Sequence, residues 1–258
     1  MLIIIILISF LGYSLLWRQI SFWARIVITN FISIIPIIGN KLIILIWGNH
    51  YINNILINRF FSIHFIFAFL LIIISIIHII ILHLNKSNNP LRTNNNLDQI
   101  NLNPIFIIKD FNWIIILILI TILINLIYPI KINNPDNFNP IKIFSTPNHI
   151  EPEWYFLFFY SILRSIENKL SGLILIIISI IIWFFYPYIN KSKFISNKFL
   201  ILNKLIISIK IIIISLITFI GSKISKQPYL YLLKQLIIMF ILSFIINNQL
   251  TKLINKLI

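Results

Sequence analysis

Long, uninterrupted apolar segments constrain this chain more than any other feature of its sequence. Of the 258 residues, 59% are hydrophobic and only 10% are charged. A water-soluble domain cannot bury that much apolar surface in a single core. A helix of about 20 apolar residues crosses a bilayer, and several windows reach this length without the alternation of a membrane strand. We therefore predict an all-α, polytopic transmembrane helical protein.

The apolar segments predict about six spans plus interfacial helices. The first span is short and covers about 1–15. The five full-length spans are expected near residues 58–84, 111–130, 171–186, 199–220 and 229–246. Mixed segments at 19–38 and 153–166 are expected to be interfacial helices, and the Asn-rich segment 85–110 is expected to be a loop outside the hydrocarbon.

The basic residues indicate contact with solvent and lipid headgroups rather than with nucleic acid. The formal net charge is +15, but the lysines and arginines lie mainly in loops between apolar segments. The chain has no cysteine, which excludes disulfides and thiolate metal ligands.

Two histidines within one predicted span are candidates for metal ligation. His64 and His78 are 14 residues apart. At about 100° and 1.5 Å per residue, they lie within roughly 40° of the same helix face and about 21 Å apart along it. Neutral imidazole is a good axial ligand for haem iron, and polar groups inside a span are usually functional. The alternative is a pair of histidines that form hydrogen bonds between helices.

A carboxylate follows the proline-containing loop 131–152. Glu153 is expected to begin the interfacial helix, beside Trp154 and Tyr155. Partial burial among aromatic rings would raise the pKa of this carboxyl, so that it could accept a proton near neutral pH. The alternative is a helix cap without a chemical role.

A second group of polar residues flanks the loop 85–110. His83, Lys109 and Asp110 lie at its two ends, at the expected edge of the membrane. A histidine and an aspartate could deliver protons to the carbonyl groups of a quinone. Solvated helix ends are the alternative.

Five stretches, in order along the chain, resemble the cytochrome b family. The most specific is Pro152-Glu153-Trp154-Tyr155, which resembles the family's quinol-oxidation signature. The others are Gly12-Tyr13 with residues from 17–30, Arg59-Phe60-Phe61 before His64, His83 with residues from 87–90 and 108–110, and Asn134-Pro135-Asp136-Asn137. The resemblance begins within the family's third helix. It therefore implies the C-terminal part of a split or truncated mitochondrial cytochrome b.

The resemblance implies a role for each candidate residue. His64 would ligate the low-potential haem b and His78 the high-potential one, each haem taking its other ligand from a second chain. Residues implied at the quinol-oxidation pocket are Glu153, Tyr155 and Tyr13, with Glu153 taking a proton. Residues implied at the quinone-reduction pocket are His83, Ser87, Lys109 and Asp110.

The same resemblance implies a subunit of quinol–cytochrome c oxidoreductase in the mitochondrial inner membrane. Its cofactors would be two haems b with ubiquinone and ubiquinol. Its partners would be a separate N-terminal cytochrome b fragment, the iron–sulfur protein, cytochrome c1, the other subunits of complex III and the lipid bilayer, in a homodimeric complex.

The implied domains are the C-terminal half of the haem-binding bundle at 1–84, a matrix-side loop at 85–110 and a four-helix membrane domain at 111–258.

A chloroplast-type complex is disfavoured, because its chains divide after the fourth helix. A haem-free structural membrane subunit that retains the fold is the alternative in a different functional class.

Overall fold

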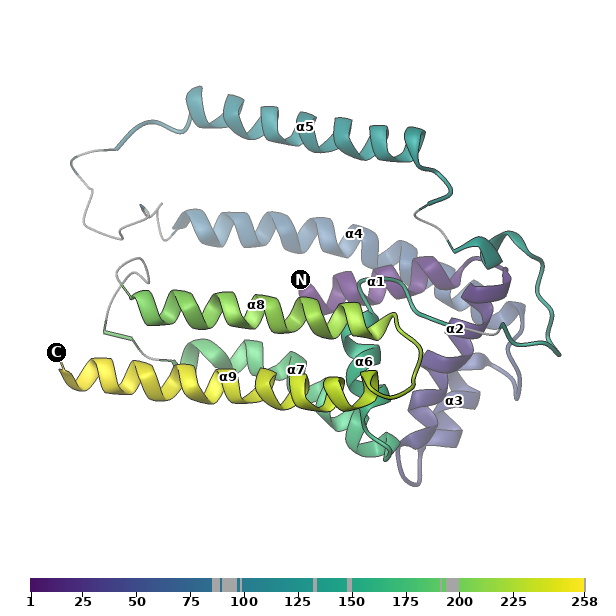
Figure 1. Ribbon diagram of the computed structural model, residues 1–258. Coiled ribbons are helices and arrows are strands. Elements are labelled where there is room, and N and C mark those ends of the chain that lie inside the picture. Colours follow the sequence, from purple (N-terminus) through teal and green to yellow (C-terminus); the bar gives the residue numbers. More distant parts are fainter. Residues whose placement is uncertain are drawn as a thin grey trace. The chain divides into compact units, whose positions relative to one another are not determined.

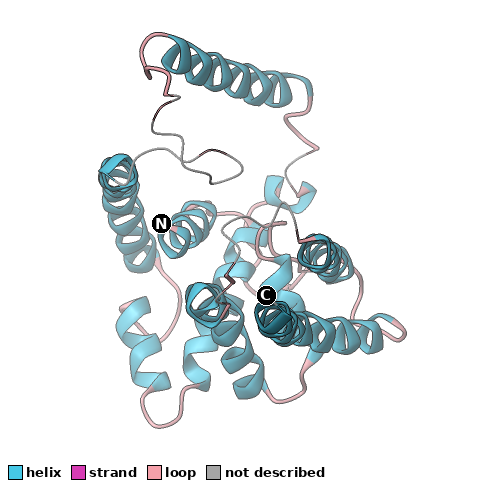
Figure 2. Ribbon diagram, turned by 90° about the vertical axis from the view of Figure 1, so that its left-hand side faces the viewer, coloured by secondary structure: helices cyan, strands magenta, loops and turns pink. Residues whose placement is uncertain are grey.

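The structure is a computed structural model in which the described residues fold entirely as helices, turns and loops. The described residues are 1–84, 89, 97, 99–131, 134–147, 150–190, 192–193 and 200–257. They contain nine α-helices and two short 3₁₀-helices, without a strand (Figures 1 and 2). The predicted all-α class is confirmed.

Helices form wherever the sequence is continuously apolar, because an isolated segment in hydrocarbon must satisfy its own backbone hydrogen bonds. The first four α-helices are α1 (Leu2–Ser14), α2 (Gln19–Asn30), α3 (Gly39–Trp47) and α4 (Asn54–Leu84). The remaining ones are α5 (Ile105–Ile127), α6 (Leu157–Ser165), α7 (Lys169–Ile189), α8 (Ile201–Gly221) and α9 (Tyr229–Leu257). The 3₁₀-helices are η1 (Phe31–Ile34) and η2 (Pro135–Phe138).

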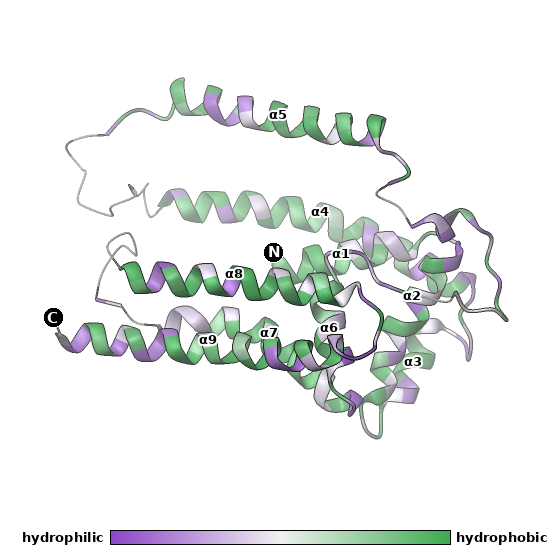
Figure 3. Cartoon of the chain, viewed as in Figure 1, coloured by the Kyte–Doolittle hydropathy of each residue, from purple (hydrophilic) through white to green (hydrophobic). Residues whose placement is uncertain are grey.

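Five helices among the described residues are long and apolar enough to cross a membrane. They are α4, α5, α7, α8 and α9, the five that the sequence predicts as full-length spans. The short first span is also present, as α1. Figure 3 shows apolar colour along most of each long helix, with polar colour concentrated towards helix ends and connections. The helix α3 was not predicted, because its apolar run is short and contains Lys41.

A glycine directly after α3 explains where this helix ends. Gly48 adopts the left-handed conformation, with φ of 70°, and its amide donates to the carbonyl oxygen of Ile44 at 2.8 Å. The indole of Trp47 donates to the hydroxyl of Thr29 at 3.0 Å and so ties α3 to α2.

The chain divides into two compact units. The first comprises 1–23 and 60–147, and the second comprises 24–59 and 148–258. In the first unit, Phe10 of α1 packs edge-on against Phe60 of α4, with ring centroids 5.7 Å apart. The outer surfaces of α4 and α5 are apolar and exposed, so lipid or neighbouring protein must cover them.

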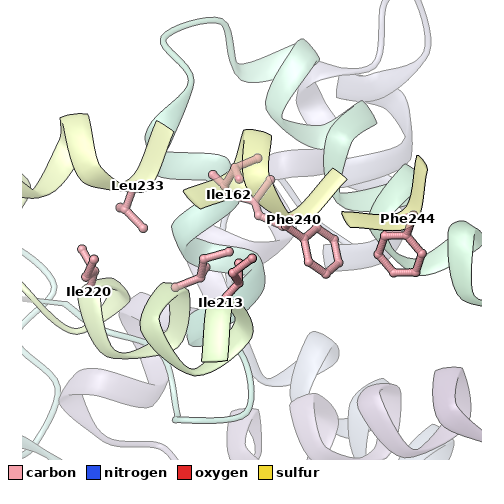
Figure 4. Packing of buried hydrophobic residues seen from close by; sticks show 8 residues of the cluster. Ile162, Ile213, Ile220, Leu233, Phe240 and Phe244 are labelled. Atoms are coloured by element: carbon pink, nitrogen blue, oxygen red, sulfur yellow. The ribbon is translucent and has the colours of Figure 1, made fainter. Parts of the chain in front are cut away.

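The second unit has its own apolar core, formed by α6, α8 and α9. Figure 4 shows Ile162 from α6 close to isoleucines of α8 and to Phe240 and Phe244 of α9. The rings of Phe158, Phe240 and Phe244 follow one another edge-to-face, at centroid distances of 5.4 and 5.2 Å. This core fixes α6, and with it the turn that carries Glu153.

Candidate functional site

The ring of His64 is held against the short helix α1. Its Nδ1 atom lies 3.1 Å from the carbonyl oxygen of Ile8. Because a carbonyl oxygen only accepts, this bond requires a proton on Nδ1 and leaves the Nε2 lone pair available to a metal. The ring is half-buried, so it is oriented by the protein and still reachable from outside.

A glycine makes the close approach of α1 to this histidine possible. A Cβ atom added at Gly12 would lie 2.9 Å from the Cε1 atom of His64 and 3.4 Å from its Nδ1. Any side chain at position 12 would therefore push the imidazole away from Ile8. Sequence reasoning placed Gly12 in the family motif but gave it no contact with His64.

The second histidine lies on the same continuous helix. The helix α4 runs unbroken from Asn54 to Leu84, so the geometry predicted for His64 and His78 holds for this helix. His78 is exposed on the apolar surface, and among the described residues it has no hydrogen bond. His83 is exposed in the last turn of α4.

The segment around η2 is tied to the junction of α1 and α2 by Asn137, a buried residue that sequence reasoning left without a role. Its Nδ2 donates to the hydroxyl oxygen of Tyr13 at 2.9 Å, and its Oδ1 accepts from the amide of Ser21 at 3.2 Å. Ser21 lies in the first turn of α2, where backbone amides lack helical partners. Asn137 therefore caps α2 and orients Tyr13 together.

We expect Asn137→Ala to destabilise this junction by about 1–3 kcal/mol, because it leaves buried polar groups without partners. The measurement is thermal unfolding of the purified complex, in which the fraction of this chain that stays soluble is recorded against temperature. Asn139→Ala is the matched control, because Asn139 is exposed. Equal melting temperatures for the two variants would contradict the assigned role.

The carboxylate Glu153 lies before the helix that was predicted to begin with it. The helix α6 starts only at Leu157, and residues 154–156 form a turn in which the amide of Phe156 donates to the carbonyl of Glu153 at 2.8 Å. The prediction of a helix start at Glu153 is wrong, because the three aromatic residues fold into a turn. Because no helix begins at Glu153, the alternative that this carboxylate only caps a helix and interacts with its dipole is not supported.

This turn carries three neighbouring aromatic side chains beside a carboxylate. The rings of Trp154 and Tyr155 lie 5.5 Å apart and those of Tyr155 and Phe156 lie 4.8 Å apart. Burial, and secondarily the negative charge of Glu153, raise the pKa of Tyr155 to about 12. Tyr155 is therefore a neutral hydrogen-bond donor at physiological pH.

The turn is anchored through α6 to the C-terminal end of α8. Arg164 donates from Nη1 to the carbonyl of Lys223 at 2.5 Å and from Nη2 to that of Ile220 at 2.8 Å. Ser161 donates to the carbonyl of Ile217 at 2.9 Å. A cation that binds the last carbonyls of a helix also complements its dipole.

Two of the residues predicted at the edge of the loop 85–110 lie in a helix instead. Lys109 and Asp110 are exposed in the first turns of α5, because this helix begins at Ile105 and not near 111. The apolar residues 105–108 extend the span by more than one turn. Ser87, predicted beside them, lies outside the described residues.

Comparison with known proteins identifies the family. The model described as Cytochrome b(N-terminal)/b6/petB matches residues 1–135, more than half of the chain. The chain belongs to the cytochrome b family. A second model, described as Cytochrome b(C-terminal)/b6/petD, matches residues 139–245.

Individual relatives agree with this family. Cytochrome b of Apis mellifera ligustica is 42% identical over 250 residues, which are 97% of this chain and 65% of the relative. The chain thus spans about two thirds of that relative's length. Among solved structures, a chain of a hyperthermophilic respiratory Complex III matches with a TM-score of 0.88 at 22% identity, over 97% of this chain and 68% of the other. At this identity the structural likeness shows the cytochrome b fold alone.

The comparisons also correct one expectation. We expected only the C-terminal part of a cytochrome b, with a separate chain for the N-terminal part. That description is wrong, because the N-terminal and C-terminal family models both match this chain. The expected companion chain is therefore not supported.

Proposed function

We propose that this cytochrome b is the haem- and quinone-binding subunit of a quinol–cytochrome c oxidoreductase. The observation that carries the proposal is the placement of His64 and His78 on the continuous apolar helix α4. Family membership supports b-type haem as the group that these two histidines ligate.

The residues present fit two haems. His64 has its Nδ1 proton engaged by Ile8, which leaves Nε2 as the ligating atom. The exposed ring of His78 is accessible from the apolar surface of α4. His64 and His78 would each hold one haem, and any further protein ligand of either haem would come from outside α4. When bound, the haems supply one-electron redox centres at two depths of the membrane.

At the quinol-oxidation pocket, Glu153 would take a proton from the quinol hydroxyl. Tyr155 is neutral at physiological pH, so it would donate a hydrogen bond and not compete as a base. Tyr13, whose hydroxyl accepts from Asn137, is the third residue that we propose for this pocket. Its part rests on the family resemblance.

At the quinone-reduction pocket, charged and polar groups would bind the quinone carbonyls and deliver protons. His83 ends α4, and Lys109 and Asp110 lie near the start of α5. Ser87, which lies between these two helices in the sequence, completes the proposed set.

The proposed assembly is a homodimeric complex III in the mitochondrial inner membrane. The partners are the iron–sulfur protein, cytochrome c1 and further subunits, with ubiquinone as substrate. These parts cover the exposed apolar surface of α4 and α5 together with lipid. The domain division at residues 84 and 110 also stays a prediction.

Optical difference spectroscopy of the purified complex tests the function. We expect quinol to reduce b-type haem associated with this chain, and the complex to reduce cytochrome c. A complex that contains this chain without b-type haem would support the haem-free structural subunit instead.

We expect Gly12→Ala to lower haem occupancy at His64. The added Cβ would lie 2.9 Å from the imidazole and displace it from Ile8. The ratio of haem to protein in the purified complex measures the effect. Gly172→Ala is the control, because Gly172 is also a helical glycine and the nearest neighbours of an added Cβ belong to Leu163, far in sequence from His64. Unchanged haem content in the Gly12 variant would contradict the close packing described here.

A further inference from the structure

A lysine lies buried inside the C-terminal helix bundle, and it is none of the residues assigned to a haem or quinone site. Lys210 is in the middle of α8 and is 5% exposed. Its ammonium nitrogen lies 3.9 Å from the ring centroid of Phe244 on α9 and 4.7 Å from that of Tyr186 on α7. Two aromatic faces therefore stabilise the cation, but neither accepts its three N–H groups as a carbonyl would.

The chain offers this cation no carboxylate in the same part of the sequence. The segment after Glu167 contains eleven lysines and no aspartate or glutamate. Among the described residues, no hydrogen bond to the Lys210 ammonium group is found. An ionised group inside a membrane bundle needs polar or aqueous surroundings, because burial without them is costly.

Polar side chains gather on one side of Lys210. The phenol oxygen of Tyr186 accepts from Asn190 Nδ2 at 3.0 Å and also from Asn247 Nδ2. The hydroxyl of Thr251 is hydrogen-bonded to Asn190 Oδ1. These residues come from the end of α7 and the last turns of α9, so the cluster lies where α7 ends and α8 begins.

One acceptor in this cluster is left over. Asn247 is 1% exposed, and its Oδ1 atom has no hydrogen-bond partner among the described residues. The phenol oxygen of Tyr186 accepts in both of its hydrogen bonds, so its own proton remains available. Lys210 and Tyr186 thus have N–H and O–H groups without acceptors, in the same cluster as Asn247 Oδ1, which has no donor. A water molecule that hydrogen-bonds to these groups would satisfy them.

The polar region is one-sided. A helical side chain tilts towards the N-terminus of its helix, so Lys210 extends towards Ile201 and the polar cluster. Asn203, buried on α8, is seven residues earlier, which is about two turns away on the same face. In the other direction α8 continues with Ile213, which belongs to the apolar core (Figure 4), and with Ile217, another member of that core.

We propose that α7, α8 and α9 enclose a water-filled polar inlet that ends at Lys210. The inlet opens beside Asn190 at the C-terminal end of α7, and its ligand is water that bridges the Lys210 ammonium group to Asn247 Oδ1. Lys210 exchanges its proton with the aqueous phase on that side alone. The inlet uses none of the residues proposed above for haem or quinone binding.

Cysteine accessibility tests the inlet directly, because the chain has no cysteine of its own. Lys210→Cys and Asn247→Cys are made in the intact complex and treated with a small, charged, membrane-impermeant thiol reagent. Sealed vesicles of each orientation are used, and labelling is read from this chain's peptides by mass spectrometry. We expect both cysteines to react at least about tenfold faster than buried controls, and from one side of the membrane only.

Two matched controls on α8 define the background. Position 217, in Ile217→Cys, is buried in the apolar core, and position 211, in Ile211→Cys, is on the exposed apolar surface. Reaction of the Lys210 and Asn247 variants no faster than Ile217→Cys would overturn the inlet. Equal labelling from both sides would overturn its one-sidedness.

A second measurement needs no substitution and so does not depend on the folding of a variant. A high-resolution map of the unsubstituted complex is expected to contain water within hydrogen-bond distance of both Lys210 Nζ and Asn247 Oδ1. Direct contact of these two atoms, without water, would overturn the proposal.

Discussion

His64→Leu is expected to remove one of two b-type haems from the complex and to abolish electron transfer across the membrane. Leucine preserves the apolar volume of α4 but has no atom that can ligate iron. Because the two histidines lie about 21 Å apart along the helix, His78→Leu should remove the other haem independently. Redox-difference spectra of each purified variant are expected to retain about half of the haem signal, each with a different component missing.

His50→Leu is the matched control for both variants. His50 is an exposed histidine outside the helices, in the connection between α3 and α4. We expect this variant to keep the complete spectrum. Loss of the same spectral component in the His64 and His78 variants would contradict the assignment of one haem to each residue.

Glu153→Gln is expected to slow quinol oxidation by about 10²–10⁴-fold, the usual contribution of a general base. The amide keeps the size of the side chain but cannot accept the quinol proton. Haem content and reduction of the haems by chemical reductants should stay unchanged. Steady-state cytochrome c reduction, measured with saturating quinol, gives the effect.

The pH dependence of the rate of quinol oxidation shows whether Glu153 acts as a base or only supports the structure. Burial raises the pKa of Tyr155 to about 12, so its phenol does not titrate in the working range. If Glu153 is the base, the rate of quinol oxidation depends on pH through its carboxylate, and we expect this dependence to vanish in the Gln variant. Glu167→Gln is the control, because Glu167 is an exposed carboxylate in a surface pair with Lys234 at 3.6 Å. Retention of the same pH dependence in Glu153→Gln would contradict the assignment.

The membrane architecture could be predicted from the sequence because hydrocarbon allows few alternatives. A segment such as 58–84 has to be a helix, whatever its neighbours do, since its backbone groups have no other partners. The five long spans needed no knowledge of packing. In contrast, α3 is short and amphipathic, so its helix depends on tertiary contacts such as the bond between Trp47 and Thr29.

Helix boundaries near the candidate site were predicted less well, because they depend on local packing. Polarity at Lys109 and Asp110 suggested a loop, although the apolar residues before them already form the first turn of α5. At Glu153 the aromatic run predicted a helix, but residues 154–156 form a turn closed by the hydrogen bond from the amide of Phe156 to the carbonyl of Glu153. Composition alone does not distinguish these outcomes.

The partners of the candidate residues could not be predicted either, because they come from distant parts of the sequence. The carbonyl of Ile8 fixes the ring of His64 across 56 positions, and Asn137 reaches Tyr13 across 124. The chemistry of each side chain was readable from the sequence. The tautomer of His64, the orientation of Tyr13 and the capping of α2 by Asn137 could be seen only in the folded structure.

The most direct test of this account is the iron coordination in a high-resolution map of the intact membrane complex. We expect two porphyrins beside α4, with one iron bonded to Nε2 of His64 and the other to the imidazole of His78. We also expect Nδ1 of His64 to donate still to the carbonyl of Ile8. Imidazoles that face lipid, or a groove without porphyrin, would contradict it.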